Sequence, residues 1–174
     1  RKLANRQIKN PLKRLKNDEF VLLVFGFING YKGVDWICDQ LKTVKNKKIR
    51  LLVVGGKNPY LAHKLSYQKF YNSIVSQLNK YNHMTYIDFV PEKDIPIYYS
   101  ASDIAVIPYE VFMAASGPFS HALSYNKPIL ISDRLKGYTN SADIREAMKY
   151  SNVGASDFIF TYTKSGIMKL INNL

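Results

Sequence analysis

The chain has 174 residues, a length that suits one domain able to bury roughly 70% of the surface of its unfolded state. With 47% hydrophobic and 22% charged residues, its composition is close to that of average soluble proteins and excludes a disordered or repetitive chain. Cys38 is the only cysteine, which excludes an internal disulfide, and no apolar run approaches the ~20 residues of a membrane-spanning helix. We therefore expect a soluble, cytoplasmic protein.

The net charge of +12 is unevenly spread, because residues 1–17 carry seven Lys or Arg and no acidic residue. A second basic group consists of Lys42, Lys45, Lys47, Lys48 and Arg50. This excess favours nucleic acid, an anionic membrane surface or a phosphorylated small molecule as a partner, and a solvated lysine-rich surface explains it equally well. We interpret residues 1–19 as a basic lead-in and residues 20–174 as the folded domain. The missing initial methionine indicates a piece cut from a longer protein.

Six apolar runs of strand length follow, separated by segments with helical periodicity. This alternation predicts βαβ units and a parallel sheet with helices on both faces. The predicted strands are residues 20–28, 49–54, 84–89, 104–108, 128–132 and 158–162. We therefore predict a Rossmann-like, doubly wound six-stranded α/β domain, in which ligands bind beyond the carboxyl ends of the strands.

The helical segments are indicated by apolar residues three or four positions apart. The first such stripe contains Val34, Ile37, Cys38, Leu41 and Val44, so we expect the Cys38 thiol to be buried and structural. A longer helix is predicted between about residues 61 and 81, another after Ser116 with Phe119, Ala122 and Leu123 on one side, and a last one over 167–174.

The loop after the first predicted strand reads FGFINGYKG and places Gly26, Lys32 and Gly33 between a strand and a helix. Small residues let the backbone approach an anion, while the helix N-terminus and the lysine supply positive charge. This pattern indicates a phosphate site, although glycines after a strand often only make a turn. It is neither a GxGxxG fingerprint nor an ATPase P-loop.

A second phosphate contact is expected after the fourth strand, where Ser116, Gly117 and Pro118 open a helix at the same sheet edge. Two helix N-termini that converge on one crevice could hold the two phosphates of a diphosphate. The alternative is an ordinary connection between a strand and a helix.

Four segments follow one another along the chain: FGFINGYKGVDWI, IRLLVVGG, MTYIDFVPEKDIPIYYSASDIAVIPY and SGPFSHALSYNKPILISD. In their order and spacing they resemble the C-terminal domain of the family 4 glycosyltransferases, which have the GT-B fold. The resemblance covers residues 20–174. It implies a retaining, metal-independent enzyme that transfers a sugar from a nucleoside diphosphate sugar, with Lys32, Ser116 and Gly117 near the diphosphate. It also implies that Val90 and Pro91 meet the base, and that an N-terminal acceptor domain is missing from this chain. No Asp-x-Asp and no cluster of His or Cys suggests a metal site.

Three positions depart from the family pattern. Phe27 stands where the family has an arginine, and Met113 and His121 stand where it has two glutamates. We expect His121 to take over the ribose contact, unless it is an ordinary surface histidine. Glu110, Met113 and Ala114 are the candidates for contact with the transferred sugar, and the catalytic residue remains unassigned.

These losses leave open a second hypothesis, in which a degenerate domain of the same fold binds a partner or an anionic surface without transferring sugar. Nucleic-acid binding rests on charge alone, because no zinc-finger spacing or aromatic RNA-binding motif supports it. No nucleic-acid partner is therefore expected. Many such enzymes act on lipid-linked acceptors, so a position at the periphery of a membrane fits the first hypothesis.

Overall fold

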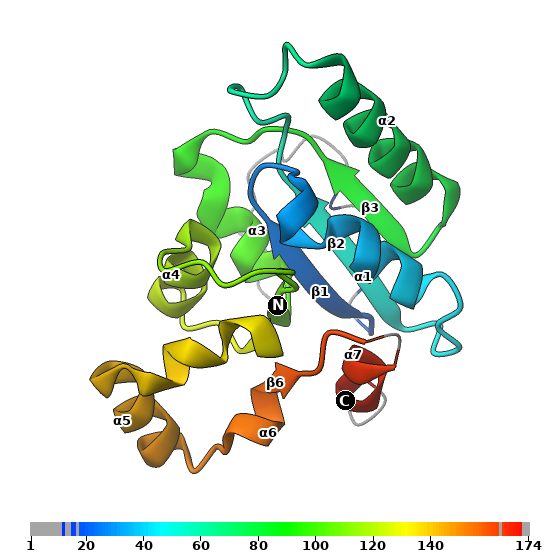
Figure 1. Cartoon of the computed structure of the whole chain (residues 1–174). Coiled ribbons are helices and arrows are strands. Elements are labelled where there is room, and N and C mark those ends of the chain that lie inside the picture. Colours follow the sequence, from blue (N-terminus) through cyan, green and yellow to red (C-terminus); the bar gives the residue numbers. More distant parts are fainter. Residues whose placement is uncertain (1–11, 13–14, 17, 164, 172–174) are drawn as a thin grey trace.

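A computed structural model describes residues 12, 15–16, 18–163 and 165–171 of the chain. Its centre is a parallel sheet of six strands in the order β3-β2-β1-β4-β5-β6 (Figure 1). The strands are β1 (Phe20–Phe25), β2 (Ile49–Val54), β3 (Met84–Ile87), β4 (Ile104–Ile107), β5 (Ile129–Ser132) and β6 (Ile159–Phe160). The predicted doubly wound fold is confirmed.

Helices cover both faces of the sheet because each central strand carries apolar side chains on both sides. On one face, Leu22 and Val53 pack against α1 (Val34–Leu41), α2 (Leu65–Lys80) and α7 (Gly166–Ile171). On the other face, Leu23 and Leu52 pack against α3 (Ile95–Ala101) and α4 (Gly117–Ser124). Leu12, from the predicted lead-in, is buried on this second face.

The first helical stripe is confirmed within α1, where its first four residues are buried and Cys38 fully so, whereas Val44 lies beyond the helix and is partly buried. Burial raises the pKa of the Cys38 thiol to about 12, which makes it the inert structural thiol that was expected. The stripe predicted for α4 is only partly correct. Ala122 is buried, but Leu123 is 47% exposed.

The segment that connects β5 to β6 differs most from the prediction. A 3-10 helix, η4 (Asp133–Asn140), leads into α5 (Ala142–Ser151) and α6 (Ala155–Phe158), and only two residues of the last predicted strand pair with β5. Two further short 3-10 helices, η2 (Gly30–Lys32) and η3 (Glu92–Asp94), precede α1 and α3. Both stand at the carboxyl edge of the sheet.

Candidate functional site

A cavity of about 340 Å³ opens at the carboxyl edge of the sheet. The strand order reverses between β1 and β4, and the crevice at such a reversal is where doubly wound sheets bind ligands. The loops after β1, β2 and β3 and the first turns of α4 surround this cavity. Its lining consists of Phe25, Gly26, Phe27, Lys32, Gly55, Gly56, Phe89, Val90, Glu92, Ile95, Gly117, Pro118 and His121.

Gly26 and Lys32 meet at the floor of this cavity. Gly26 has φ of 105°, a conformation that side chains disfavour, and a Cβ added there would lie 2.7 Å from the Lys32 Nζ. The glycine therefore gives the lysine ammonium the space it occupies. The sequence predicted both residues, and the structure brings them together.

Lys32 is a buried cation, with only 8% of its surface exposed. Its Nζ lies 5.9 Å from the centre of the Tyr109 ring, and no carboxylate pairs with it among the described residues. Burial alone lowers the pKa of Lys32 to about 8. A buried ammonium without a counter-ion at a cavity is well placed to receive an anion.

Tyr109 joins the lysine to the start of α4. Its hydroxyl lies 3.0 Å from the Ser116 Oγ, which in turn accepts a hydrogen bond from the Phe119 backbone N–H. Because Pro118 has no N–H and the Phe119 N–H is bonded, Gly117 is the residue at this helix start that offers a backbone donor toward the cavity. Ser116 is buried and acts as the N-cap, while Gly117 lines the cavity.

His121 lines the cavity on the side of α4 and is half-buried among aromatic rings. The Phe25 ring meets it edge-on at 6.0 Å, and the Tyr125 ring lies parallel to it at 6.0 Å. This packing fixes the imidazole at the cavity wall. The expected orientation of His121 toward the crevice is therefore observed.

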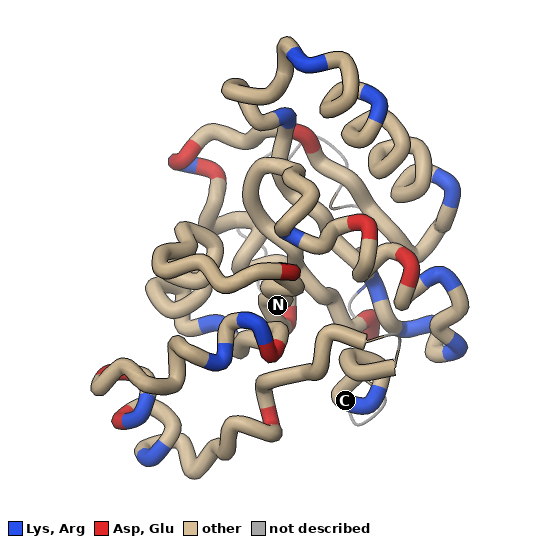
Figure 2. The backbone as a smooth tube through the Cα atoms, in the orientation of Figure 1, with Lys and Arg blue, Asp and Glu red and all other residues tan. Residues whose placement is uncertain are grey.

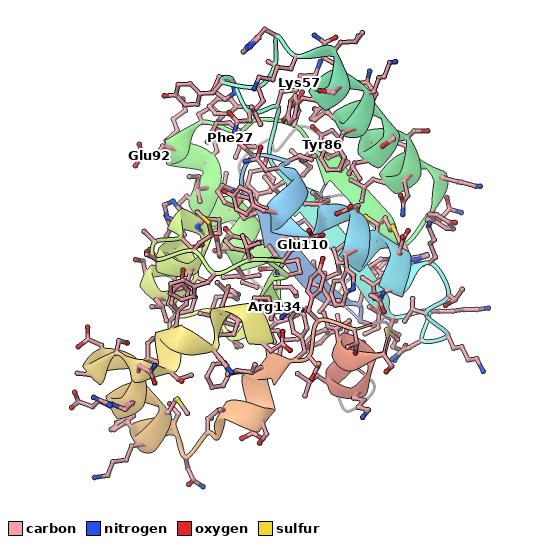
Figure 3. All side chains as sticks on the ribbon, in the orientation of Figure 1. Phe27, Lys57, Tyr86, Glu92, Glu110 and Arg134 are labelled. Carbon is pink, nitrogen blue, oxygen red and sulfur yellow. The ribbon has the colours of Figure 1, made fainter. Side chains whose placement is uncertain are left out.

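The residues considered for the transferred sugar lie away from this cavity. The Glu110 carboxylate accepts a hydrogen bond of 2.9 Å from the Tyr162 hydroxyl, and the Met113 carbonyl accepts one of 2.6 Å from the Tyr138 hydroxyl. Figure 3 shows Phe27 and Glu92 together beside the start of α3, with Glu110 farther down the molecule toward Arg134. Neither Ala114 nor Pro91 is part of the lining, although Val90 is.

Sequence reasoning missed several lining residues, above all Gly55, Gly56 and Phe89. The two glycines follow β2, whose loop was not among those expected to carry chemistry. The VVGG run was the available signal, since it places two small residues directly after a buried strand. Among the described residues, no group of three or more His, Cys, Asp or Glu could hold a metal ion.

Comparison with known proteins identifies the family. The profile described as glycosyl transferases group 1 matches residues 5–150. The chain belongs to this family. A search of curated proteins finds no significant match.

Several solved glycosyltransferase structures share the fold of this group 1 domain. Sucrose-phosphate synthase from Thermosynechococcus elongatus aligns with a TM-score of 0.66 at 15% identity, covering 92% of this chain and 37% of that one. Alr3699/HepE from Anabaena, solved with UDP-glucose, aligns at 0.64 and 19% identity over 95% and 43%. The C-terminal domain of the LpcC protein from Francisella tularensis aligns at 0.53 and 19% identity over 73% and 67%.

The group 1 domain thus spans less than half of the two longer proteins that it resembles. They have the GT-B fold, and the sheet described here corresponds to one of its Rossmann-like halves. The predicted fold and membership of the group 1 glycosyl transferases are both confirmed, and the assignment to family 4 stays a prediction. No helix in the described part of the chain is long and apolar enough to cross a membrane.

Proposed function

We propose that this chain is the donor-binding, C-terminal half of a retaining, metal-independent glycosyltransferase. It transfers a hexose from a nucleoside diphosphate sugar to a glycan or a lipid-linked acceptor. One observation carries this proposal: the buried Lys32 ammonium faces the cavity at the reversal of strand order and has no carboxylate partner among the described residues. Alr3699/HepE, which has the same fold, was crystallised in complex with UDP-glucose. This complex supports a nucleoside diphosphate sugar as the ligand of the present chain.

In this reaction the bond between the sugar C1 and the diphosphate oxygen breaks, and the electron pair stays on that oxygen. The oxygen of an acceptor hydroxyl forms the new bond to C1, and its proton passes to the departing diphosphate or to solvent. Negative charge therefore increases on the diphosphate as the sugar leaves. A lysine held at the cavity floor and a backbone N–H from Gly117 can stabilise this charge without rearrangement of the site. Lys32 can do so only when it is protonated.

In this proposal, an N-terminal domain that the present chain does not contain supplies the acceptor-binding site and the remaining catalytic groups. The longer relatives make such a domain reasonable, because this chain spans 37% and 43% of two of them. We propose a cytoplasmic enzyme at the periphery of a membrane. The fragment alone binds donor but transfers nothing.

Titration calorimetry with UDP, GDP and UDP-glucose tests the donor site directly. We expect binding to the wild-type chain, and a loss of at least tenfold in affinity for Lys32→Met, because a charge-assisted contact to the diphosphate is removed. Lys136→Met is the matched control, since Lys136 is exposed and lies outside the cavity. Equal binding by wild type and Lys32→Met, or no binding at millimolar ligand, contradicts the proposal.

The competing candidate is a degenerate domain of the same fold that binds a partner or an anionic surface and transfers no sugar. The observation in its favour is that Glu110 lies outside the cavity and is engaged by Tyr162, while Met113 and His121 stand at the positions of the two family glutamates. Turnover by the full-length protein decides between the two. Sugar transfer that disappears in Lys32→Met excludes the degenerate domain, whereas no turnover by the full-length protein with its acceptor supports it.

A further inference from the structure

Two phenylalanines stack against each other in the lining of the cavity. The rings of Phe27 and Phe89 are nearly parallel, with an interplanar angle of 13° and ring centres 6.4 Å apart. Phe27 follows β1 and Phe89 follows β3, so the pair spans the cavity mouth from two loops, and both residues line it. We call Phe27 and Phe89 the phenylalanine pair.

The exposure of this pair needs an explanation. Phe89 is 66% exposed, although burying a phenylalanine stabilises a fold by about 1.5–3 kcal/mol. Its backbone is nevertheless anchored, because the Phe89 N–H donates to the Asp88 carboxylate at 2.7 Å and its Cβ lies close to Gly56. An aromatic ring that is largely uncovered on an anchored backbone is suited to receive another flat apolar surface.

We propose that the phenylalanine pair is the stacking platform for the nucleobase of the donor, and that Phe27 and Phe89 are donor-binding residues. This inference rests on the proposed function. Aromatic side chains bind nucleobases through their π faces, and such stacking is tolerant of base identity. Phe27 occupies the position at which the family resemblance leads one to expect an arginine, so stacking at this position takes the place of a phosphate contact.

The position of the pair relative to Lys32 fits one nucleoside diphosphate. Phe27 directly follows Gly26, the residue that leaves room for the Lys32 Nζ. The same loop therefore presents an aromatic face on one side and a cation on the other. A base on the phenylalanine pair and a diphosphate at Lys32 would both fit within the single cavity that these residues line.

The test separates base binding from phosphate binding. Phe27→Ala and Phe89→Ala are titrated with UDP and GDP, and their affinity for inorganic pyrophosphate is measured by displacement of bound UDP. We expect each variant to lose about 5- to 150-fold in nucleotide affinity, the range of one base–aromatic contact, with pyrophosphate affinity unchanged. Tyr150→Ala is the control, because this aromatic residue is 93% exposed and lies on α5, far from the lining.

A second variant gives a direct signal of stacking. Phe89→Trp places an indole at the platform, and we expect UDP and GDP to quench its fluorescence while pyrophosphate does not. Trp36, the only native tryptophan, stacks on Tyr162 and does not line the cavity. Wild-type nucleotide affinity in both alanine variants, or an equal loss of pyrophosphate and nucleotide affinity, overturns the inference. Absence of nucleotide binding by the wild type instead contradicts the proposed function itself.

Discussion

If Lys32 binds the donor diphosphate as proposed, its titration links donor binding to pH. Its folded-state pKa is lowered by burial to about 8, from an ordinary value near 10.5, so the free lysine is half charged near pH 8 and almost fully charged only at about pH 7 and below. A bound diphosphate favours the charged form and raises this pKa again. Between the two values, binding therefore takes up a proton.

This linkage predicts that UDP affinity is constant from about pH 7 to 7.5 and falls as the pH rises through 8, by up to tenfold per pH unit. The pH range begins at 7 because the terminal phosphate of the nucleotide is already ionised there. Calorimetry in two buffers of different ionisation enthalpy measures both the affinity and the proton uptake. A similar fall in Lys32→Met would show that another group is responsible.

The lowered pKa of Lys32 also makes the stability of the fold depend on pH. A lowered lysine pKa means that the folded state binds fewer protons than the unfolded state between about pH 8 and 10.5. The burial of Lys32 therefore costs stability that is recovered as the pH rises through this window. At neutral pH the free protein keeps this cost, which is consistent with a residue placed for binding and not for folding.

Individual site residues could be predicted from the sequence where they lie in the connection between a strand and the next helix. Lys32 and Gly117 were identified because each lies in the connection from a buried strand to a helix, Lys32 just before α1 and Gly117 at the first residue of α4. Phe89 was not, since its role depends on the ring of Phe27, which only the parallel arrangement of β1 and β3 around β2 brings near it. A contact between loops from different strands leaves no periodic signal in the sequence.

At the level of elements, the strands were predictable but their ends were not. The strand expected over 20–28 stops at Phe25, because Gly26 at φ of 105° turns the chain, although Ile28 still forms a bridge to Lys57. The α5 helix was missed for a different reason. Its apolar stripe is short, consisting of Ile144, Ala147 and Met148, and none of its residues is fully buried.

The junction of η2 and α1 depends on Gly33. It has φ of 65°, and a Cβ there would lie 2.0 Å from the Pro108 carbonyl oxygen at the end of β4. We expect Gly33→Ala to destabilise the fold by about 1–3 kcal/mol or more, since strain in the left-handed region adds to a steric clash with backbone. Urea unfolding measures this cost.

Gly30→Ala is the matched control in the same 3-10 turn. An added Cβ at Gly30 meets nothing within 4 Å, and its φ is not positive. Its effect should stay within about 0.5 kcal/mol, as for most surface substitutions. Equal unfolding midpoints for the two variants would mean that the loop relaxes around the clash and that Gly33 does not fix its shape.

At the level of the whole molecule, a turn with three exposed lysines and the cavity lie at opposite edges of the sheet. Lys45, Lys47 and Lys48 are exposed in the turn that leads into β2, at the amino edge of the strands (Figure 2). Their basic neighbours are already paired, Lys42 with Asp39 at 2.5 Å and Arg50 with Glu19 at 2.6 Å. A membrane bound by this turn would face away from the donor cavity.

Co-sedimentation with vesicles that contain anionic lipid tests whether the turn binds a membrane. If it does, the triple variant Lys45→Glu, Lys47→Glu, Lys48→Glu should lose roughly tenfold or more in binding, because each lysine near an anionic surface contributes about 1 kcal/mol. UDP affinity should not change, since the cavity lies at the other edge. Unchanged vesicle binding would instead assign membrane contact to another surface. That result would favour a lipid-linked acceptor, because it leaves the cavity edge free to face the bilayer that carries the lipid.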